Sequence, residues 1–156
     1  MRIRICAVGR LRAGPERALV DDYLERFARS GRALGLGPAT ETEVEDRRGG
    51  GTAAEGALLA RAVPDGAALT VLDERGQLLT SPALAERLAR WRDEGRADAA
   101  FVIGGADGVD PTLRARADLV LSLGPMVWPH MLVRAMLAEQ IYRTVTILAG
   151  TPYHRV

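Results

Sequence analysis

The sequence contains no lysine, because all 21 basic side chains among its 156 residues are arginines. This absence excludes three kinds of site that depend on a lysine amine. They are the lysine of a triphosphate-binding P-loop, a Schiff-base lysine and the lysine of a pyridoxal-phosphate enzyme.

Cysteine, histidine and long apolar runs are also scarce. Cys6 is the only cysteine, so no internal disulfide forms, and its apolar surroundings predict a buried thiol. The two histidines, His130 and His154, would need carboxylates to complete a zinc site, so we expect no metal. No apolar run approaches the roughly 18 residues of a membrane span, and no signal-peptide stretch opens the sequence. We therefore expect a cytoplasmic protein without a membrane partner.

The composition is that of one globular domain, residues 1–156, with 47% hydrophobic and 26% charged residues. The net charge of +1 hides a gradient along the chain. Residues 51–111 hold six arginines and ten acidic residues, whereas residues 112–156 hold five arginines and two acidic residues. The positive C-terminal end allows an RNA partner but lacks the basic stripe of an autonomous nucleic-acid binder.

Strand-like and helix-like segments alternate along the chain. We predict strands at 2–8, 40–44, 68–72, 99–103 and 119–123. Helices are predicted at 15–29, at 53–62, from a cap at Ser81 to about Gly95, from 110, and from 130 to 145 or beyond. This order indicates an α/β domain with a mostly parallel sheet, in which ligands gather at the carboxyl ends of the strands. Three loops qualify: 73–76, 104–108 and 124–128.

Two of these loops have features of a binding site. Gly104-Gly105-Ala106-Asp107-Gly108 permits a close backbone approach to a ligand, and we expect valine at Gly104 to fill the pocket; the alternative is a simple tight turn. It matches neither the dinucleotide nor the triphosphate fingerprint. Gly124-Pro125-Met126-Val127-Trp128-Pro129 is an apolar loop whose backbone groups suit an adenine and its ribose; the alternative is a buried connection.

The C-terminal stretch is rich in chemically active side chains. Glu139 and Arg143 are spaced as an i, i+4 ion pair, which need be no more than a surface contact. Arg134 is either a solvated arginine or a partner for an RNA phosphate or a structural carboxylate. The chain ends on Pro152-Tyr153-His154-Arg155-Val156, unlike the small polar residues of most termini.

Several of these positions together resemble the signature of the ribosomal RNA large subunit methyltransferase H family. That family belongs to the SPOUT class of trefoil-knotted methyltransferases. The matching residues are Gly104-Gly105-x-x-Gly108, Ser122-Leu123, Pro129-His130, Arg134, Glu139-Gln140-x-Tyr142-Arg143 and Pro152-Tyr153-His154-Arg155. Two earlier segments, Val71-Leu72-Asp73 and Ser81-Pro82 through Trp91, also fit the family in order and spacing. The resemblance implies a knotted SPOUT fold, a homodimer, and methyl transfer from S-adenosylmethionine to ring N3 of a pseudouridine in 23S rRNA within the ribosome.

The resemblance also implies roles for single residues. The cofactor is expected to contact Leu72, Gly104, Leu123, Gly124, Pro125, Met126, Val127 and Trp128. Tyr153, His154 and Arg155 are the candidate catalytic residues, with His154 favoured as base or orienter because the imide must lose its proton. Arg134, Arg143 and Arg155 are expected to contact RNA. One subunit's tail or last helix is expected to complete the other subunit's site.

The chain departs from the family pattern in the cofactor loop. Gly124 and Val127 stand where members usually have serine and threonine, so side-chain hydrogen bonds to the cofactor are lost while backbone contacts survive. The alternative function is therefore a non-catalytic ribosome-binding or RNA-binding domain with a degenerate cofactor loop. A nicotinamide oxidoreductase is disfavoured, because no fingerprint or ribose-binding acid is correctly placed.

Overall fold

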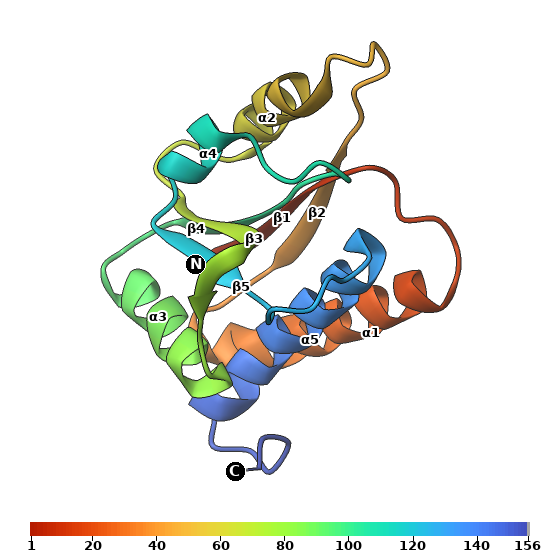
Figure 1. Ribbon diagram of the computed structural model, residues 1–156. Coiled ribbons are helices and arrows are strands. Elements are labelled where there is room, and N and C mark those ends of the chain that lie inside the picture. Colours follow the sequence, from red (N-terminus) through yellow and green to blue (C-terminus); the bar gives the residue numbers. More distant parts are fainter. Residues whose placement is uncertain (156) are drawn as a thin grey trace.

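The computed structural model describes residues 1–155 and contains a five-stranded sheet covered by helices on both faces (Figure 1). The strands are β1 (Arg2–Val8), β2 (Ala39–Val44), β3 (Ala68–Leu78), β4 (Asp98–Ile103) and β5 (Leu119–Ser122). Their order is β2-β1-β4-β3-β5, and every neighbouring pair is parallel. The predicted α/β fold with a mostly parallel sheet is confirmed. The trefoil knot stays a prediction.

Helices α1 (Pro15–Gly31), α3 (Ser81–Asp93) and α5 (His130–Leu148) cover one face of the sheet, and α2 (Gly51–Ala62) and α4 (Pro111–Ala115) cover the other (Figure 1). A short 3-10 turn, Arg32–Leu34, follows α1. None of the helices within residues 1–155 is long and apolar enough to cross a bilayer.

The side chains of β1 show how the core divides between the two faces. Ile3 and Ile5 pack into the cluster under α1, α3 and α5, whereas Cys6 and Val8 pack under α2 and α4. This alternation follows from the period of two along a strand. Burial raises the pKa of the Cys6 thiol to about 11, so the thiol is protonated at neutral pH and structural, as predicted.

The start of α3 corrects one sequence prediction. The side chain of Thr80, not that of Ser81, accepts the capping hydrogen bond from the Ala83 amide at 3.3 Å. Ser81 is the first helical residue, and its hydroxyl donates to Oε1 of Gln140 at 2.7 Å. The hydroxyl therefore joins α3 to α5 instead of capping its own helix.

Strand β3 is longer than predicted and contains an irregularity. Leu121 of β5 pairs with both Leu72 and Gln77, so residues 73–76 bulge out of the ladder between them. A β-carbon on Gly76 would lie 2.7 Å from the carbonyl oxygen of Val120, so glycine lets the bulge lie directly on β5. The bulge places loop 73–76 at the sheet edge where the carboxyl ends of the strands meet.

Candidate functional site

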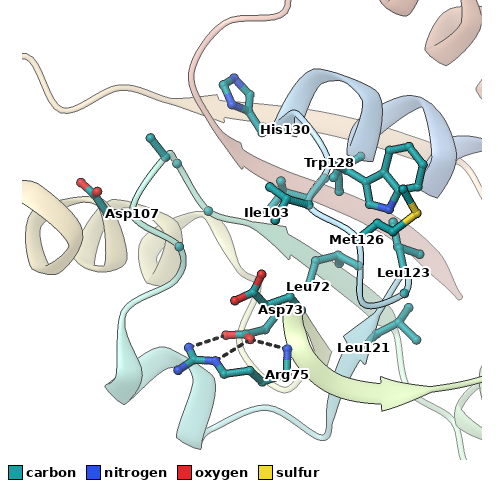
Figure 2. Close-up of a pocket in the computed structure, with 18 residues that line it drawn as sticks. Leu72, Asp73, Arg75, Ile103, Asp107, Leu121, Leu123, Met126, Trp128 and His130 are labelled. Carbon is teal, nitrogen blue, oxygen red and sulfur yellow. Dashed lines mark hydrogen bonds and ion pairs between the residues drawn. The ribbon is translucent and has the colours of Figure 1, made fainter.

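Three segments enclose a pocket of about 390 Å³ (Figure 2). They are the bulge 73–76 within β3 and the loops 104–108 and 124–128 at the carboxyl ends of β4 and β5. The sequence predicts all three as ligand-binding loops, and the structure corrects the first, which belongs to β3. The strand order explains their meeting, because β3 lies between β4 and β5 and all three run in the same direction. The volume lies within the range of roughly 300–1,000 Å³ typical of small-molecule sites.

Seven of the eight predicted cofactor residues line this pocket: Leu72, Gly104, Leu123, Gly124, Met126, Val127 and Trp128. Pro125 shapes the loop but is not part of the lining. The sequence placed Asp73 and Gly105 in candidate ligand-binding loops without giving them a role, and it did not assign the lining residues Ile103, Leu121, His130 and Val133 to the site. Most of these residues could have been found from the sequence, because they lie next to the end of a predicted strand or next to a predicted loop.

The loop 124–128 is exposed, so its interpretation as a buried connection is wrong. Met126 is 66% and Val127 84% exposed. The hydroxyl of Ser122 accepts a hydrogen bond from the Gly124 amide at 3.1 Å and donates to the Glu74 carbonyl at 3.1 Å. One side chain thus connects two of the three pocket loops. Within residues 1–155, the amides of residues 126–128 donate no hydrogen bond to the protein, which leaves them available to a ligand.

Gly104 is required for a reason that the sequence did not reveal. A β-carbon at this position would overlap the carbonyl group of Gly108 and lie 2.9 Å from Cγ2 of Val109. A side chain at position 104 would therefore point toward residues 108 and 109 of the same loop, and not into the pocket. The expectation that valine at Gly104 fills the pocket is corrected, because valine there would displace the whole loop.

Asp73 forms a fixed polar edge of the pocket, and its side chain is only 6% exposed. Its carboxylate accepts from the Arg75 amide at 2.9 Å and the Arg75 guanidinium at 3.1 Å (Figure 2). It also accepts from the Arg114 guanidinium at 3.1 Å. The hydrogen bonds from Arg75 are the main reason why the pKa of Asp73 falls to about 2. The carboxylate is ionised at neutral pH and ties loop 73–76 to α4.

The C-terminal tail is docked on α5 through Glu139. Its carboxylate accepts from the Tyr153 hydroxyl at 3.0 Å and from the Arg143 guanidinium at 2.6 and 2.9 Å. The Tyr153 ring lies 4.8 Å from the Tyr142 ring and 4.8 Å from the Arg143 guanidinium carbon. Nδ1 of His154 lies 3.3 Å from the same guanidinium. The predicted ion pair between Glu139 and Arg143 is confirmed, and it organises the tail.

Burial and the neighbouring groups set the protonation of Tyr153. Desolvation, followed by hydrogen bonds with Tyr23 and Glu139, raises the pKa of Tyr153 above its ordinary value. The phenol is therefore protonated at neutral pH, and its hydroxyl donates to Glu139.

No residue of the tail described here, up to Arg155, lines the pocket of its own chain. Glu139 follows His130 by nine positions on α5, which corresponds to roughly 14 Å along the helix axis. The tail lies at the far end of that helix (Figure 1). The sequence-predicted catalytic and cofactor residues are therefore two separate clusters in one chain.

The structure corrects the assignment of Arg134 to RNA binding. Its side chain is 1% exposed and donates to Glu43 at 2.6 Å, to the Val8 carbonyl at 3.1 Å and to the Gly9 carbonyl. Of the roles considered for Arg134 from the sequence, the structure shows the pairing with a structural carboxylate, that of Glu43. Arg155, by contrast, is exposed, and the Arg143 side chain is 24% exposed.

Within residues 1–155, no group of three or more histidine, cysteine, aspartate or glutamate side chains is placed to hold a metal ion.

Comparison with known proteins identifies the family. The family profile described as "Predicted SPOUT methyltransferase" matches residues 1–154. A protein of Roseobacter denitrificans named ribosomal RNA large subunit methyltransferase H is 71% identical over 155 residues, covering 99% of each chain. Proteins with the same name from Paracoccus denitrificans and Ruegeria sp. are 70% and 67% identical, covering 99% and 100% of each chain.

A solved structure shares the fold at low sequence identity. A probable methylase family protein from Haemophilus influenzae superposes with a TM-score of 0.53 at 13% identity, over 99% of this chain and 70% of the other. The matched profile spans all three pocket loops and all but the last two residues of the tail. The resemblance seen in the sequence is confirmed: the chain belongs to the ribosomal RNA large subunit methyltransferase H family of SPOUT methyltransferases.

Proposed function

We propose that this protein transfers a methyl group from S-adenosylmethionine to ring N3 of a pseudouridine in 23S rRNA of the large ribosomal subunit. The observation that carries the proposal is the pocket formed jointly by loops 73–76, 104–108 and 124–128. Full-length relatives named ribosomal RNA large subunit methyltransferase H, up to 71% identical, support the substrate class.

The residues of the pocket fit this cofactor. Leu72, Ile103 and Leu121 offer apolar surface for a purine, and Trp128 offers an aromatic face (Figure 2). The free amides of residues 126–128 supply hydrogen-bond donors for ring nitrogens or ribose oxygens. Because these donors belong to the backbone, the absence of hydroxyls at positions 124 and 127 leaves them unchanged.

When bound, S-adenosylmethionine supplies a methyl group that is already activated on a sulfonium. The protein has two remaining tasks, which are to align the uracil-like ring with that methyl group and to stabilise the imide anion that remains when the N3 proton passes to solvent water. A guanidinium has no acceptor, so Arg143 donates to Nδ1 of neutral His154, which then carries its proton on Nε2. In this tautomer His154 offers an N–H to the developing imide anion, and its role is that of an orienter and electrostatic stabiliser.

A homodimer brings the two clusters together. An apolar groove of about 640 Å³ runs between them and shares Leu121, Leu123 and Gly124 with the cofactor pocket. At its other end it reaches Glu139, which holds the tail. Exposed leucines lie along the groove: Leu19 (44%), Leu78 (70%) and Leu132 (37%). A second copy bound by a two-fold interface covers these side chains and places each tail near the partner's pocket.

The RNA contacts in this proposal come from Arg143 and Arg155, beside the tail residues Tyr153 and His154. Arg155 is exposed and positively charged, and it directly follows the imidazole. Stacking by an aromatic ring and pairing by a guanidinium are the contacts that hold an unstacked ribosomal base. A cytoplasmic location, where ribosomes are available, belongs to this proposal.

Two measurements test the proposal. Calorimetric titration should show one S-adenosylmethionine bound per chain, and tritium transfer from the methyl-labelled cofactor should label 23S rRNA in ribosomes at a single pseudouridine, located by nuclease digestion and mass spectrometry. Parallel assays with 70S ribosomes and naked rRNA identify the substrate form. Ribosome binding without cofactor binding would instead support the non-catalytic domain with a degenerate loop.

A further inference from the structure

The loop between β1 and α1, residues 9–14, borders the cofactor pocket without lining it. A β-carbon on Gly9 would lie 3.9 Å from Nε2 of His130, and a β-carbon on Gly105 would lie 3.2 Å from Cγ1 of Val8. His130 and Gly105 both line the pocket. The carboxyl end of β1 therefore adjoins two separate segments of the pocket wall, and the loop that leaves it begins at the pocket rim.

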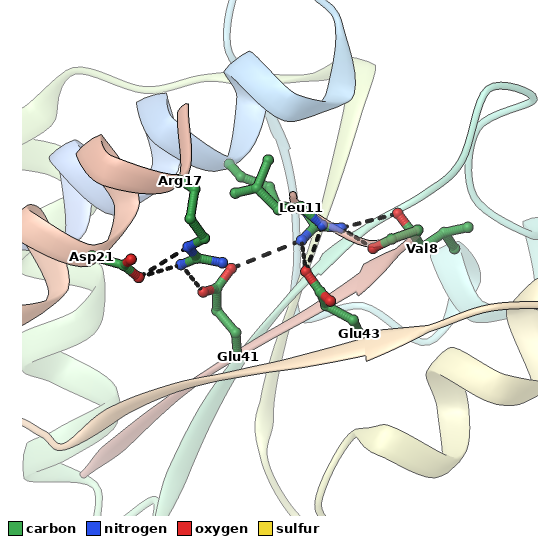
Figure 3. A network of polar contacts seen from close by, with 8 residues as sticks. Val8, Leu11, Arg17, Asp21, Glu41 and Glu43 are labelled. Carbon is green, nitrogen blue, oxygen red and sulfur yellow. Dashed lines mark hydrogen bonds and ion pairs between the residues drawn. The ribbon is translucent and has the colours of Figure 1, made fainter. Parts of the chain in front are cut away.

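An ion pair between buried Arg134 and partly buried Glu43 fixes the backbone at the start of this loop (Figure 3). Arg134 donates to the carbonyls of Val8 and Gly9 and to Oε1 of Glu43. The same Oε1 accepts from the Leu11 amide at 2.7 Å. The Gly9 carbonyl and the Leu11 amide are the backbone groups on either side of residue 10. Arg134 and Glu43 thus form hydrogen bonds with the backbone groups immediately before and after Arg10.

Arg10 itself remains available for an external partner. It is exposed, and within residues 1–155 its guanidinium takes part in no ion pair or hydrogen bond. Arg12, two positions along, is also exposed and unpaired within the same range. Arg17 at the start of α1 differs, because it binds Asp21 at 2.7 Å and Glu41. Desolvating Arg134 is costly, so its use to immobilise a short exposed loop indicates that the position of that loop matters.

We propose that Arg10 binds a backbone phosphate of the rRNA next to the target nucleotide, and that Arg134 and Glu43 are positioning residues for it. The inference rests on the proposed function and specifies how its substrate is held. A guanidinium forms paired hydrogen bonds to phosphate oxygens, and such contacts fix the register of a protein on nucleic acid without reading its sequence. Arg10 lies beside the pocket, so it holds the backbone while the base enters.

The first experiment measures binding of full-length protein to 70S ribosomes, or to naked 23S rRNA if that is the form the wild type binds, over a series of salt concentrations. Arg10→Gln should weaken binding roughly tenfold. It should also reduce the slope of log K against log salt by about 0.7–0.9. Arg10→Lys should keep the slope, because it keeps the charge. Affinity for S-adenosylmethionine should stay at the wild-type value.

Arg61→Gln is the matched control. Arg61 is also exposed and unpaired within the described residues, but it lies in the last turn of α2, which leads to the opposite edge of the sheet. This variant should bind RNA as the wild type does. Wild-type affinity and slope in Arg10→Gln, or an equal loss in Arg61→Gln, would overturn the inference.

A double-mutant cycle tests the positioning role. Glu43→Gln should weaken RNA binding in the wild-type background and have little further effect in the Arg10→Gln background. Equal losses in both backgrounds would show a general structural role and overturn this part. Arg10-dependent RNA binding without methyl transfer would refute the proposed function alone. Methyl transfer with an unaffected Arg10→Gln variant would refute this inference alone.

Discussion

At the scale of single residues, the two arginines of α5 show how one residue type takes two roles. Arg134 is buried against Glu43 and backbone carbonyls, whereas Arg143 is partly exposed and holds the tail through Glu139. They are nine positions apart, which is about two and a half helical turns, so they face opposite sides of the helix. One stabilises the loop at the pocket rim and the other organises groups for the substrate.

The role of His154 predicts a pH-dependent loss of activity. His154→Ala should slow methyl transfer strongly at neutral pH and less at high pH, where the imide loses its proton without help. Single-turnover rates between pH 6.5 and 9.5 would measure this difference, with cofactor affinity as a control for folding. A loss that is the same at every pH would argue against any role for His154 in stabilising the imide anion.

Asp73 predicts how stability depends on acid. Its pKa is lowered to about 2 in the folded protein from an ordinary value of 3.8. The ionised form is therefore favoured by folding, and this stabilisation is present above about pH 4 and is lost as the pH falls toward 2. Urea midpoints should show Asp73→Asn to be less stable than the wild type at pH 7, with the difference shrinking at pH 3. A constant difference would mean that the ion pairs with Arg75 and Arg114 contribute nothing.

At the scale of elements, the tail is part of the folded structure and not a free end. Its Tyr153 ring packs on Tyr142, and its hydroxyl binds Glu139. From the sequence, the tail would serve only the RNA, and its removal would leave the melting temperature nearly unchanged. The contacts with α5 revise that expectation, because their loss has a cost in stability. Val156 lies outside the described residues.

Deleting residues 152–156 should reduce methyl transfer by orders of magnitude. It should also lower the melting temperature by a few degrees, since a partly buried hydrogen bond and an aromatic pair contribute on the order of 1–2 kcal/mol. Cofactor affinity should change little, because no described tail residue lines the pocket of its own chain. Tyr153→Phe keeps the packing and removes the hydroxyl, so it should show a smaller loss of stability. Full activity in the truncated protein would show that the tail has no catalytic role.

At the scale of the whole molecule, the function that we propose gives each chain an incomplete site. The pocket lies at the carboxyl ends of the strands, and Glu139, which holds the tail, lies roughly 9 Å along α5 beyond Val133, the last pocket-lining residue of that helix. The groove that separates them is lined by exposed leucines. The second copy of the chain that we propose would explain both observations, because it would cover the apolar surface and supply the missing groups.

The proposed dimer can be tested by placing a charge in the groove. Leu78→Asp should produce monomers in light scattering at micromolar concentration and lose most methyl transfer, while retaining the cofactor pocket within each chain. Met131→Asp is a matched control, because Met131 is 40% exposed but does not line the groove. A fully active wild-type monomer would refute the requirement for a partner.

The sequence by itself determined the elements and the kind of site. Alternating apolar residues mark the strands, and the segments 73–76, 104–108 and 124–128 carry the glycines, prolines and acids of the site. These are local properties, because strand period and turn chemistry depend on neighbouring residues. Family resemblance then identified seven of the residues that line the pocket.

Only the tertiary structure decided how these parts meet. The strand order β2-β1-β4-β3-β5 brings loops from three strands to one pocket and places the end of β1 beside them. Packing against that end of β1 buried Arg134. The close approach of Gly108 made Gly104 necessary, and the contacts with Glu139 and Tyr142 hold the tail on α5, away from the pocket. Such contacts join residues up to 126 positions apart. No local pattern specifies them, because the side of a helix that faces the sheet is set by the whole core.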